Sequence, residues 1–122
     1  MPILNVEIVT HQNEGIRPDL AMELANQAGE VFGSAPGSTW VKVYPIAAEH
    51  YAENMVASGS VFPVFVSVLK AKLPSPEPLQ AEVTKLTAII ARVCNRPQDN
   101  VHIIYVPEIA GRVAFGGKVL PG

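Results

Sequence analysis

The amino-acid sequence contains one pattern of elements twice, and this repeat restricts the fold more than any other feature. Residues 3–9 are mostly apolar and predict a strand. Residues 18–33 carry apolar side chains at helical spacing, from Leu20 to Phe32, and end at a glycine. Residues 39–44 predict a second strand. A strand, a helix and a strand in succession indicate a β-α-β unit.

The second copy follows a connector of polar and small residues at 47–59. Residues 41–43, Val-Lys-Val, match residues 101–103, Val-His-Ile, 60 positions later. The chain is therefore predicted to be one domain made of two pseudo-repeats, about 2–59 and 60–122. The second copy is expected to place its strand, helix and strand at residues 61–69, 79–93 and 101–106.

Each unit should pair its two strands in parallel through a right-handed crossover. Two units then give an α+β fold, a four-stranded mixed sheet with two helices on one face. The third strand, however, is apolar on both faces, because Val64, Val66 and Val68 alternate with Phe65 and Leu69. Such a strand is covered on both sides. Since two helices cover only one face, we expect neighbouring copies to cover the other and the chain to be a homo-oligomer.

The composition fits this architecture and excludes several classes of function. A chain of 122 residues with 48% hydrophobic residues can bury a real core. The net charge is −2 and the basic residues are scattered, so we expect no nucleic-acid partner. No signal-peptide pattern and no apolar run of about 20 residues is present, so no membrane partner is expected. Cys94 is the only cysteine and fits a reducing compartment, which predicts a cytoplasmic protein.

Pro2 gives the first strand an unusual starting point. If the initiator methionine is removed, Pro2 becomes a secondary amine at the start of a strand. An α-amine has a reference pKa of about 7.7–8.0, and burial and nearby positive charge lower that pKa. A base with a pKa near neutrality suits removal of a proton beside a carbonyl. Pro2 is therefore the candidate catalytic residue, whereas a retained methionine would leave its nitrogen a non-basic amide.

A proline-initiated strand heading a duplicated β-α-β chain of this length resembles the tautomerase superfamily, which includes 4-oxalocrotonate tautomerase and macrophage migration inhibitory factor. Besides Pro2, the resemblance rests on residues 96–105, Arg-Pro-Gln-Asp-Asn-Val-His-Ile-Ile-Tyr, and on residues 111–117, Gly-Arg-Val-Ala-Phe-Gly-Gly. The latter run is similar to the glycine-rich C-terminal hairpin of 4-oxalocrotonate tautomerase. The resemblance covers essentially the whole chain. It implies an amino-terminal proline that moves a proton in a small 2-keto acid or enol, with no cofactor, in a trimer whose sites lie at the interfaces.

The resemblance also implies residues for the anionic end of the substrate. Lys70 and Lys72 end the third strand where family members carry basic residues. His102 stands where other members carry an arginine or tyrosine that reaches into a neighbour's pocket. Arg112 lies in the hairpin that should border the pocket, and Phe115 would form an apolar wall that lowers the amine pKa. Each of these residues also has a purely structural interpretation, as a strand end, an interface residue or a hairpin residue.

Other polar residues leave alternatives open. Glu49, His50 and Glu53 cluster in the connector, but a third ligand of fixed geometry is not evident, so no metal site is predicted. Cys94 is interpreted as a small core residue. A dehalogenase, hydratase or decarboxylase of the same family would need a carboxylate to activate water, which Glu53 or Glu108 could supply. A non-enzymatic binding or signalling protein on this scaffold is the other alternative to the predicted keto–enol tautomerase.

Overall fold

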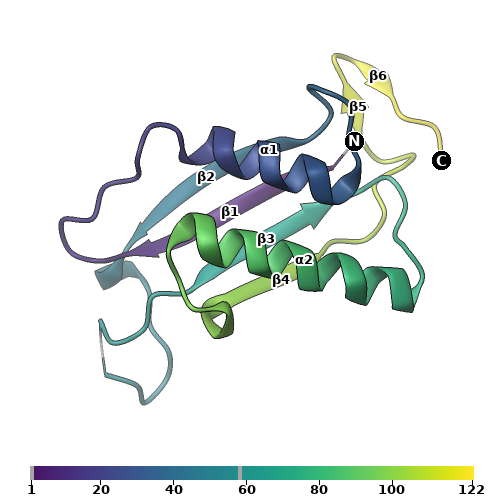
Figure 1. The fold of residues 1–122 in the computed structure, drawn as a ribbon. Coiled ribbons are helices and arrows are strands. Elements are labelled where there is room, and N and C mark those ends of the chain that lie inside the picture. Colours follow the sequence, from purple (N-terminus) through teal and green to yellow (C-terminus); the bar gives the residue numbers. More distant parts are fainter. Residues whose placement is uncertain (1, 58) are drawn as a thin grey trace.

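The computed structural model describes residues 2–57 and 59–122. Two helices lie side by side over one face of a sheet, and a small hairpin follows at the end of the chain (Figure 1). The 3₁₀ turns are η1 (Ala48–His50) and η2 (Gln98–Asn100). The helices and strands are β1 (Ile3–Thr10), α1 (Leu20–Phe32), β2 (Trp40–Ala47), β3 (Val64–Leu69), α2 (Pro76–Cys94), β4 (Val101–Tyr105), β5 (Ala114–Phe115) and β6 (Lys118–Val119).

The main sheet has the strand order β2-β1-β3-β4. Within each β-α-β unit the strands are parallel, β1 with β2 and β3 with β4, and the two units meet at the antiparallel pair of β1 and β3. In this register Ile3 pairs with both Trp40 and Leu69, and Val68 pairs with Tyr105. The predicted fold class, a mixed sheet of two tandem units with both helices on one face, is confirmed.

The ends of the second-half elements differ from the sequence prediction because of proline. β3 begins at Val64 rather than at residue 61. Pro63, which has no N–H, contributes only its carbonyl, a 3.0 Å acceptor for the Val9 amide. α2 begins at Pro76 rather than at residue 79. Pro76 and Pro78 belong to the first turn of this helix, where a missing N–H breaks no hydrogen bond.

The core lies between the helices and the facing side of the sheet. Alternation along each strand turns every second side chain of β1 and β3 toward α1 and α2. Each large aliphatic side chain buried in this way stabilises the fold by about 1.5–3 kcal/mol. The most deeply buried of them are Leu4, Val6, Val64, Val66, Val68, Leu24, Leu86 and Ile90.

The opposite face of the sheet is not covered by helices. Trp40, Tyr44 and Ile104 are 42%, 45% and 56% exposed on this face. Asn5, on the same face of β1, has a buried Oδ1 that accepts no hydrogen bond within the described residues. Exposed apolar side chains and a buried polar atom without a partner are expected on a face that a neighbouring copy of the chain covers. They are therefore consistent with the predicted homo-oligomer.

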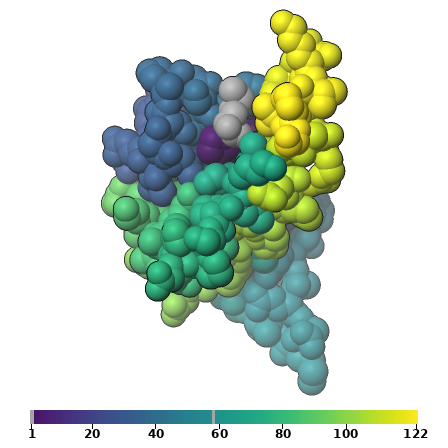
Figure 2. All heavy atoms as spheres, turned by 90° about the vertical axis from the view of Figure 1, so that its right-hand side faces the viewer, coloured from purple at the N-terminus to yellow at the C-terminus, as the bar shows by residue number. Residues whose placement is uncertain are grey.

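The C-terminal hairpin closes one end of the molecule. Ala114 pairs with Val119, and Phe115 with Lys118. Gly116 and Gly117 form the turn with φ values of 59° and 85°, a left-handed pair that favours glycine at both positions. Figure 2 shows this yellow hairpin next to the purple start of the chain, so the C-terminal hairpin borders the N-terminal strand.

Candidate active site at the start of the first strand

Pro2 is buried immediately before β1. Its carbonyl accepts a hydrogen bond of 3.0 Å from the Trp40 amide at the start of β2. Because Ile3 pairs with Leu69 in the antiparallel register, the next residues outward, Pro2 and Lys70, are neighbours across the two strands. The start of β1, the start of β2, the end of β3 and the C-terminal hairpin therefore meet at one end of the sheet (Figure 1).

Two aromatic side chains form an apolar wall at this end. The Phe115 ring packs edge-on against the Trp40 ring, with centroids 5.4 Å apart and an interplanar angle of 86°. The Trp40 indole Nε1 donates to the Gly37 carbonyl at 2.9 Å, which fixes the ring. Phe115 was predicted as an apolar wall. Trp40 was not predicted, although its place at the start of a strand parallel to the first could have suggested it.

Lys70 is held on the helix side of the sheet. Its ammonium lies 2.9 Å from Glu82 Oε1 of α2 and 5.1 Å from the centroid of the Phe32 ring. The other Glu82 oxygen accepts a 2.5 Å hydrogen bond from the Tyr105 hydroxyl. Burial and the hydrogen bond to Glu82 raise the pKa of Tyr105. Glu82 therefore offsets the positive charge of Lys70, and Glu82 and Tyr105 are residues that the sequence did not reveal.

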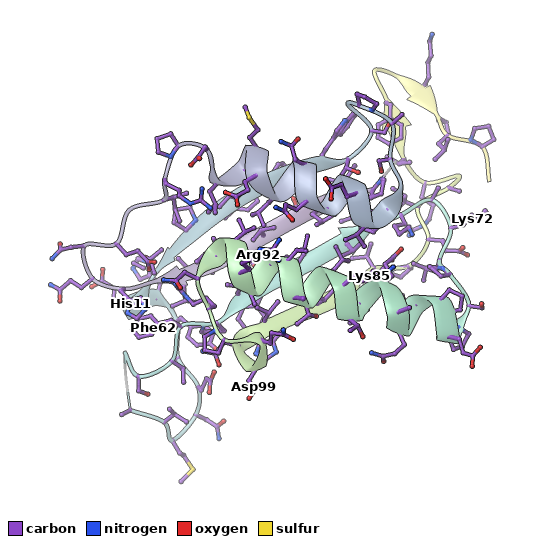
Figure 3. All side chains as sticks on the ribbon, in the orientation of Figure 1. His11, Phe62, Lys72, Lys85, Arg92 and Asp99 are labelled. Carbon is purple, nitrogen blue, oxygen red and sulfur yellow. The ribbon has the colours of Figure 1, made fainter. Side chains whose placement is uncertain are left out.

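Lys72 and Arg112, the other two predicted cations at this end, differ in how firmly hydrogen bonds hold them. Lys72 is exposed on the loop between β3 and α2 (Figure 3). Arg112 donates to the carbonyls of Pro107 and Glu108, at 2.9 Å and 2.7 Å from Nη2. The Glu108 carboxylate accepts from the Leu73 amide at 2.8 Å. Arg112 and Glu108 thus tie the hairpin and the β3–α2 loop together at the rim of the site.

His102 lies at the opposite end of β3 and β4 from Lys70 within one chain. It pairs with Phe65 and is exposed on the open face of the sheet. Its ring lies 5.4 Å from the Phe65 ring, which lies 5.8 Å from the Tyr51 ring. The Tyr51 hydroxyl donates to Glu53 at 2.6 Å, and this bond raises the pKa of Tyr51 to about 12. The structure does not bring His102 or Glu53 to Pro2 of the same chain.

Comparison with known proteins gives a match at the level of structure. Neither protein-family models nor curated proteins match the sequence. The protein Pt0534 inactivated by 2-oxo-3-pentynoate superposes with a TM-score of 0.77 at 12% identity, over 97% of this chain and 94% of that chain. A fused 4-OT, an asymmetric trimer, gives 0.75 at 14% over 95% of both chains. Macrophage migration inhibitory factor from Oncomelania hupensis gives 0.72 at 16% over 98% and 82%.

The chain has the tautomerase fold. The resemblance predicted from the proline start and the tandem repeat is thereby confirmed for the architecture. At 12–16% identity the likeness shows the fold alone, so the activity has to be argued from the residues at Pro2.

The other end of this tautomerase fold is built around Arg96. Its side chain is only 4% exposed, and it donates to the carbonyls of Val9 at 2.9 Å and Phe62 at 3.0 Å. It also forms an ion pair of 2.8 Å with Glu14, which lowers the pKa of that carboxyl. His11 stacks on Phe62 at a centroid distance of 3.6 Å (Figure 3). The sequence marked Arg96 only as part of a family-like run and did not reveal this structural role.

The described residues were also compared with the requirements for a metal site, a membrane-spanning helix and a reactive cysteine. Across residues 2–57 and 59–122, no three side chains of His, Cys, Asp or Glu are grouped in a way that could hold a metal ion. Within the same ranges, no helix is both long and apolar enough to cross a membrane. Cys94 is buried, as expected for a core residue, and burial raises the pKa of its thiol to about 11.

Proposed function

We propose that this protein is a keto–enol tautomerase of small 2-keto acids or their enols, with the Pro2 amine as general base and general acid. The observation that carries the proposal is the position of Pro2. It is buried at the start of β1, next to the Trp40–Phe115 wall and across from Lys70. Apolar surroundings and a nearby cation both favour the neutral form of an amine, which is the form that accepts a proton.

The proposed reaction needs only one proton carrier. The neutral amine of Pro2 removes a proton from the carbon beside the keto group, and the C–H electron pair becomes the enolate π bond. The resulting ammonium returns the proton to the enolate oxygen, or to another carbon, so that base and substrate are restored. The mechanism requires removal of Met1, and Met1 lies outside the described residues.

The substrate carboxylate would be bound by cations at the rim of the site. Lys72 on the β3–α2 loop and Arg112 beside the hairpin lie at the Pro2 end of the sheet, and Lys70 lies deeper, paired with Glu82. His102 would come from a neighbouring copy, because its own chain places it at the far end of β4. The uncovered apolar face of the sheet supports a homotrimer, in which one copy's His102 faces another's Pro2. The single buried Cys94 is consistent with a cytoplasmic location.

The alternatives that need a water-activating carboxylate fit this end of the molecule less well. Glu108 is held by the Leu73 amide at 2.8 Å, and Glu53 is held by the Tyr51 hydroxyl at 2.6 Å. A hydratase, dehalogenase or decarboxylase would have to free one of these groups. The non-enzymatic alternative would gain support from a mature chain that keeps Met1.

The decisive experiment compares Pro2→Ala with the matched variant Pro63→Ala. Both prolines are buried and precede a strand, but only Pro2 can carry a free amine. Intact mass first shows whether the mature chain has lost methionine. We then expect Pro2→Ala, which replaces the secondary ring amine by a primary amine free to rotate, to lower kcat/KM for ketonisation of enolpyruvate by about 10²-fold, the lower end of the range for general base catalysis. Pro63→Ala should retain wild-type kcat/KM once folded, and equal rates for wild type and Pro2→Ala would refute the proposed role.

A further inference from the structure

Glu82 joins three elements at the Pro2 end of the molecule. It lies on α2, and its two carboxylate oxygens bind Lys70 at the end of β3 and Tyr105 at the end of β4, at 2.9 Å and 2.5 Å. The side chains of Lys70 and Glu82 are only 19% and 13% exposed. Two bonds to one carboxylate, together with the Phe32 ring 5.1 Å from the ammonium, leave Lys70 little freedom. The ammonium is therefore held at one place rather than extended into solvent.

The register places this cluster next to the proposed base. Leu69 pairs with Ile3, so Lys70 lies across from Pro2, and Tyr105 pairs with Val68 one step away on β4. A charge in such a partly buried place acts on its neighbours more strongly than a charge in water. A cation beside an amine disfavours the protonated amine, and an anion favours it. Lys70 and Glu82 therefore act on Pro2 in opposite directions.

The other charged groups at this end are more exposed or lie on the opposite face of the sheet. Lys72 and Lys118 are exposed on the β3–α2 loop and on β6, and Glu30 is exposed in the last turn of α1. Arg112 and Glu108 are engaged with the backbone of their loops. By strand alternation, Glu7 of β1 and Lys42 of β2 belong to the open face, away from the helices. Within residues 2–57 and 59–122, Lys70 and Glu82 are thus the charged pair that lies at the Pro2 end and is sheltered from solvent.

We propose that Glu82 and Tyr105 are positioning residues that hold the Lys70 ammonium beside Pro2, and that this triad sets the fraction of neutral Pro2 amine at pH 7. The inference rests on the proposed function of Pro2 and adds the groups that tune it. Lys70 then acts on the base more than on the substrate carboxylate, because Glu82 already occupies its ammonium. Lys72 and Arg112 are left as the carboxylate-binding cations of the chain itself.

The test is a pH titration of the Pro2 nitrogen, measured by NMR on protein labelled with nitrogen-15 proline. Of the 11 prolines in the chain, only an amino-terminal one can titrate. Lys70→Met should raise the pKa of the Pro2 amine by about 0.5–1 unit, because it leaves Glu82 as an uncompensated anion. Glu82→Gln should lower that pKa by a similar amount, because it leaves Lys70 uncompensated. The double variant should return to within about 0.3 unit of wild type.

Two more variants separate positioning from general damage to the fold. Tyr105→Phe should raise the pKa of the Pro2 amine by less than Lys70→Met does, because Glu82 loses the hydroxyl that shares its charge and Lys70 is held less firmly. Lys85→Met removes an exposed lysine from the same helix and should leave that pKa unchanged. The acidic limb of the kcat/KM pH profile, which reports the base in the free enzyme, should move with the NMR value in each variant.

The outcomes distinguish this inference from the function on which it rests. A titrating proline nitrogen whose pKa moves the same way in Lys70→Met and Glu82→Gln, or not at all, overturns the triad and leaves the proposed function intact. A mature wild-type chain with Met1 retained and no titrating proline overturns both. Opposite shifts, cancelled in the double variant, support the triad, because loss of folding cannot produce shifts of opposite sign.

Discussion

The two ends of the sheet share one backbone arrangement, a buried proline directly before a strand. They differ in the chemistry open to the proline nitrogen and in the side chains around it. Pro2 precedes β1 and Pro63 precedes β3, and both are buried. Each accepts one backbone hydrogen bond of 3.0 Å through its carbonyl, Pro2 from Trp40 and Pro63 from Val9. The difference is covalent, since Pro63 is an internal residue whose nitrogen is always an amide. The proposed base therefore has no counterpart at the Pro63 end.

The charged side chains at the two ends also differ. At the Pro63 end, the buried guanidinium of Arg96 binds the carbonyls of Phe62 and Val9 and the Glu14 carboxylate, and so joins three segments of the chain. At the Pro2 end the charged pair is Lys70 with Glu82, and the register of β1 and β3 places Lys70 across from Pro2. The comparison teaches that the two ends of a duplicated unit can carry different networks, since a buried guanidinium joins three segments at one end and a smaller ion pair lies at the other.

The largest expected effect concerns Arg96. Arg96→Met would leave the Glu14 carboxylate and four backbone carbonyls, those of Val9, Phe62, Cys94 and Asn95, without their buried donor. Removing one partner of a buried ion pair typically costs about 3–5 kcal/mol, and we expect a loss of that size in the free energy of unfolding. The control is Arg92→Met, which removes an exposed arginine whose 2.6 Å partner is Gln27 and should cost about 0.5 kcal/mol or less. Urea unfolding measures both, and equal losses would contradict a specialised Pro63 end.

A smaller effect is expected for the acidic partner at the same end. The Arg96 hydrogen bond holds the Glu14 pKa below its usual 4.5, so Glu14 stabilises the fold above that pH, and this stabilisation is lost as pH falls through the lower folded value. Glu14→Gln should therefore reduce the free energy of unfolding by about 1 kcal/mol at pH 7, a value discounted for partial exposure. The difference from wild type should shrink as pH falls below 4.5. A deficit independent of pH would point to packing rather than to charge.

The smallest effect is expected in the hairpin that borders Pro2. Gly117 has φ of 85°, and a Cβ there would meet open space, so Gly117→Ala introduces backbone strain without a clash. We expect a loss of about 1 kcal/mol in the free energy of unfolding, with a raised KM because Phe115 and Arg112 shift. Gly15→Ala is the matched control, since Gly15 also faces open space but has no left-handed φ. An unchanged KM in Gly117→Ala would show that the hairpin does not contribute to substrate binding.

Much of the fold could be predicted because it depends on periodicity and on glycine. Apolar side chains at helical spacing between Leu20 and Phe32 match α1, which ends at Gly33 with φ of 64°. The errors lie where proline has two possible roles. Pro76 and Pro78 can end a strand or begin a helix, and only the packing of α2 on the sheet decides between them.

The candidate site could be predicted only in part. Pro2 was found because its position in the chain gives it a chemistry that no other residue has, and Phe115 was found through a family-like run. Glu82 and Tyr105 carried no signal, because their importance depends on a contact between residues 23 positions apart. His102, by contrast, was proposed from the sequence, but within one chain it lies at the end of the sheet opposite to Pro2.

By itself, the sequence determined the tandem β-α-β architecture, because strand and helix periodicities and their repeat are local properties of the chain. It also predicted Pro2 as the candidate base, because an amino-terminal proline would carry a free amine. Only the tertiary structure decided which charges surround that amine and which stabilise the opposite end. The physical reason is that ion pairs and hydrogen bonds such as Lys70–Glu82 and Arg96–Glu14 form between segments that come together only when the sheet and the helices pack.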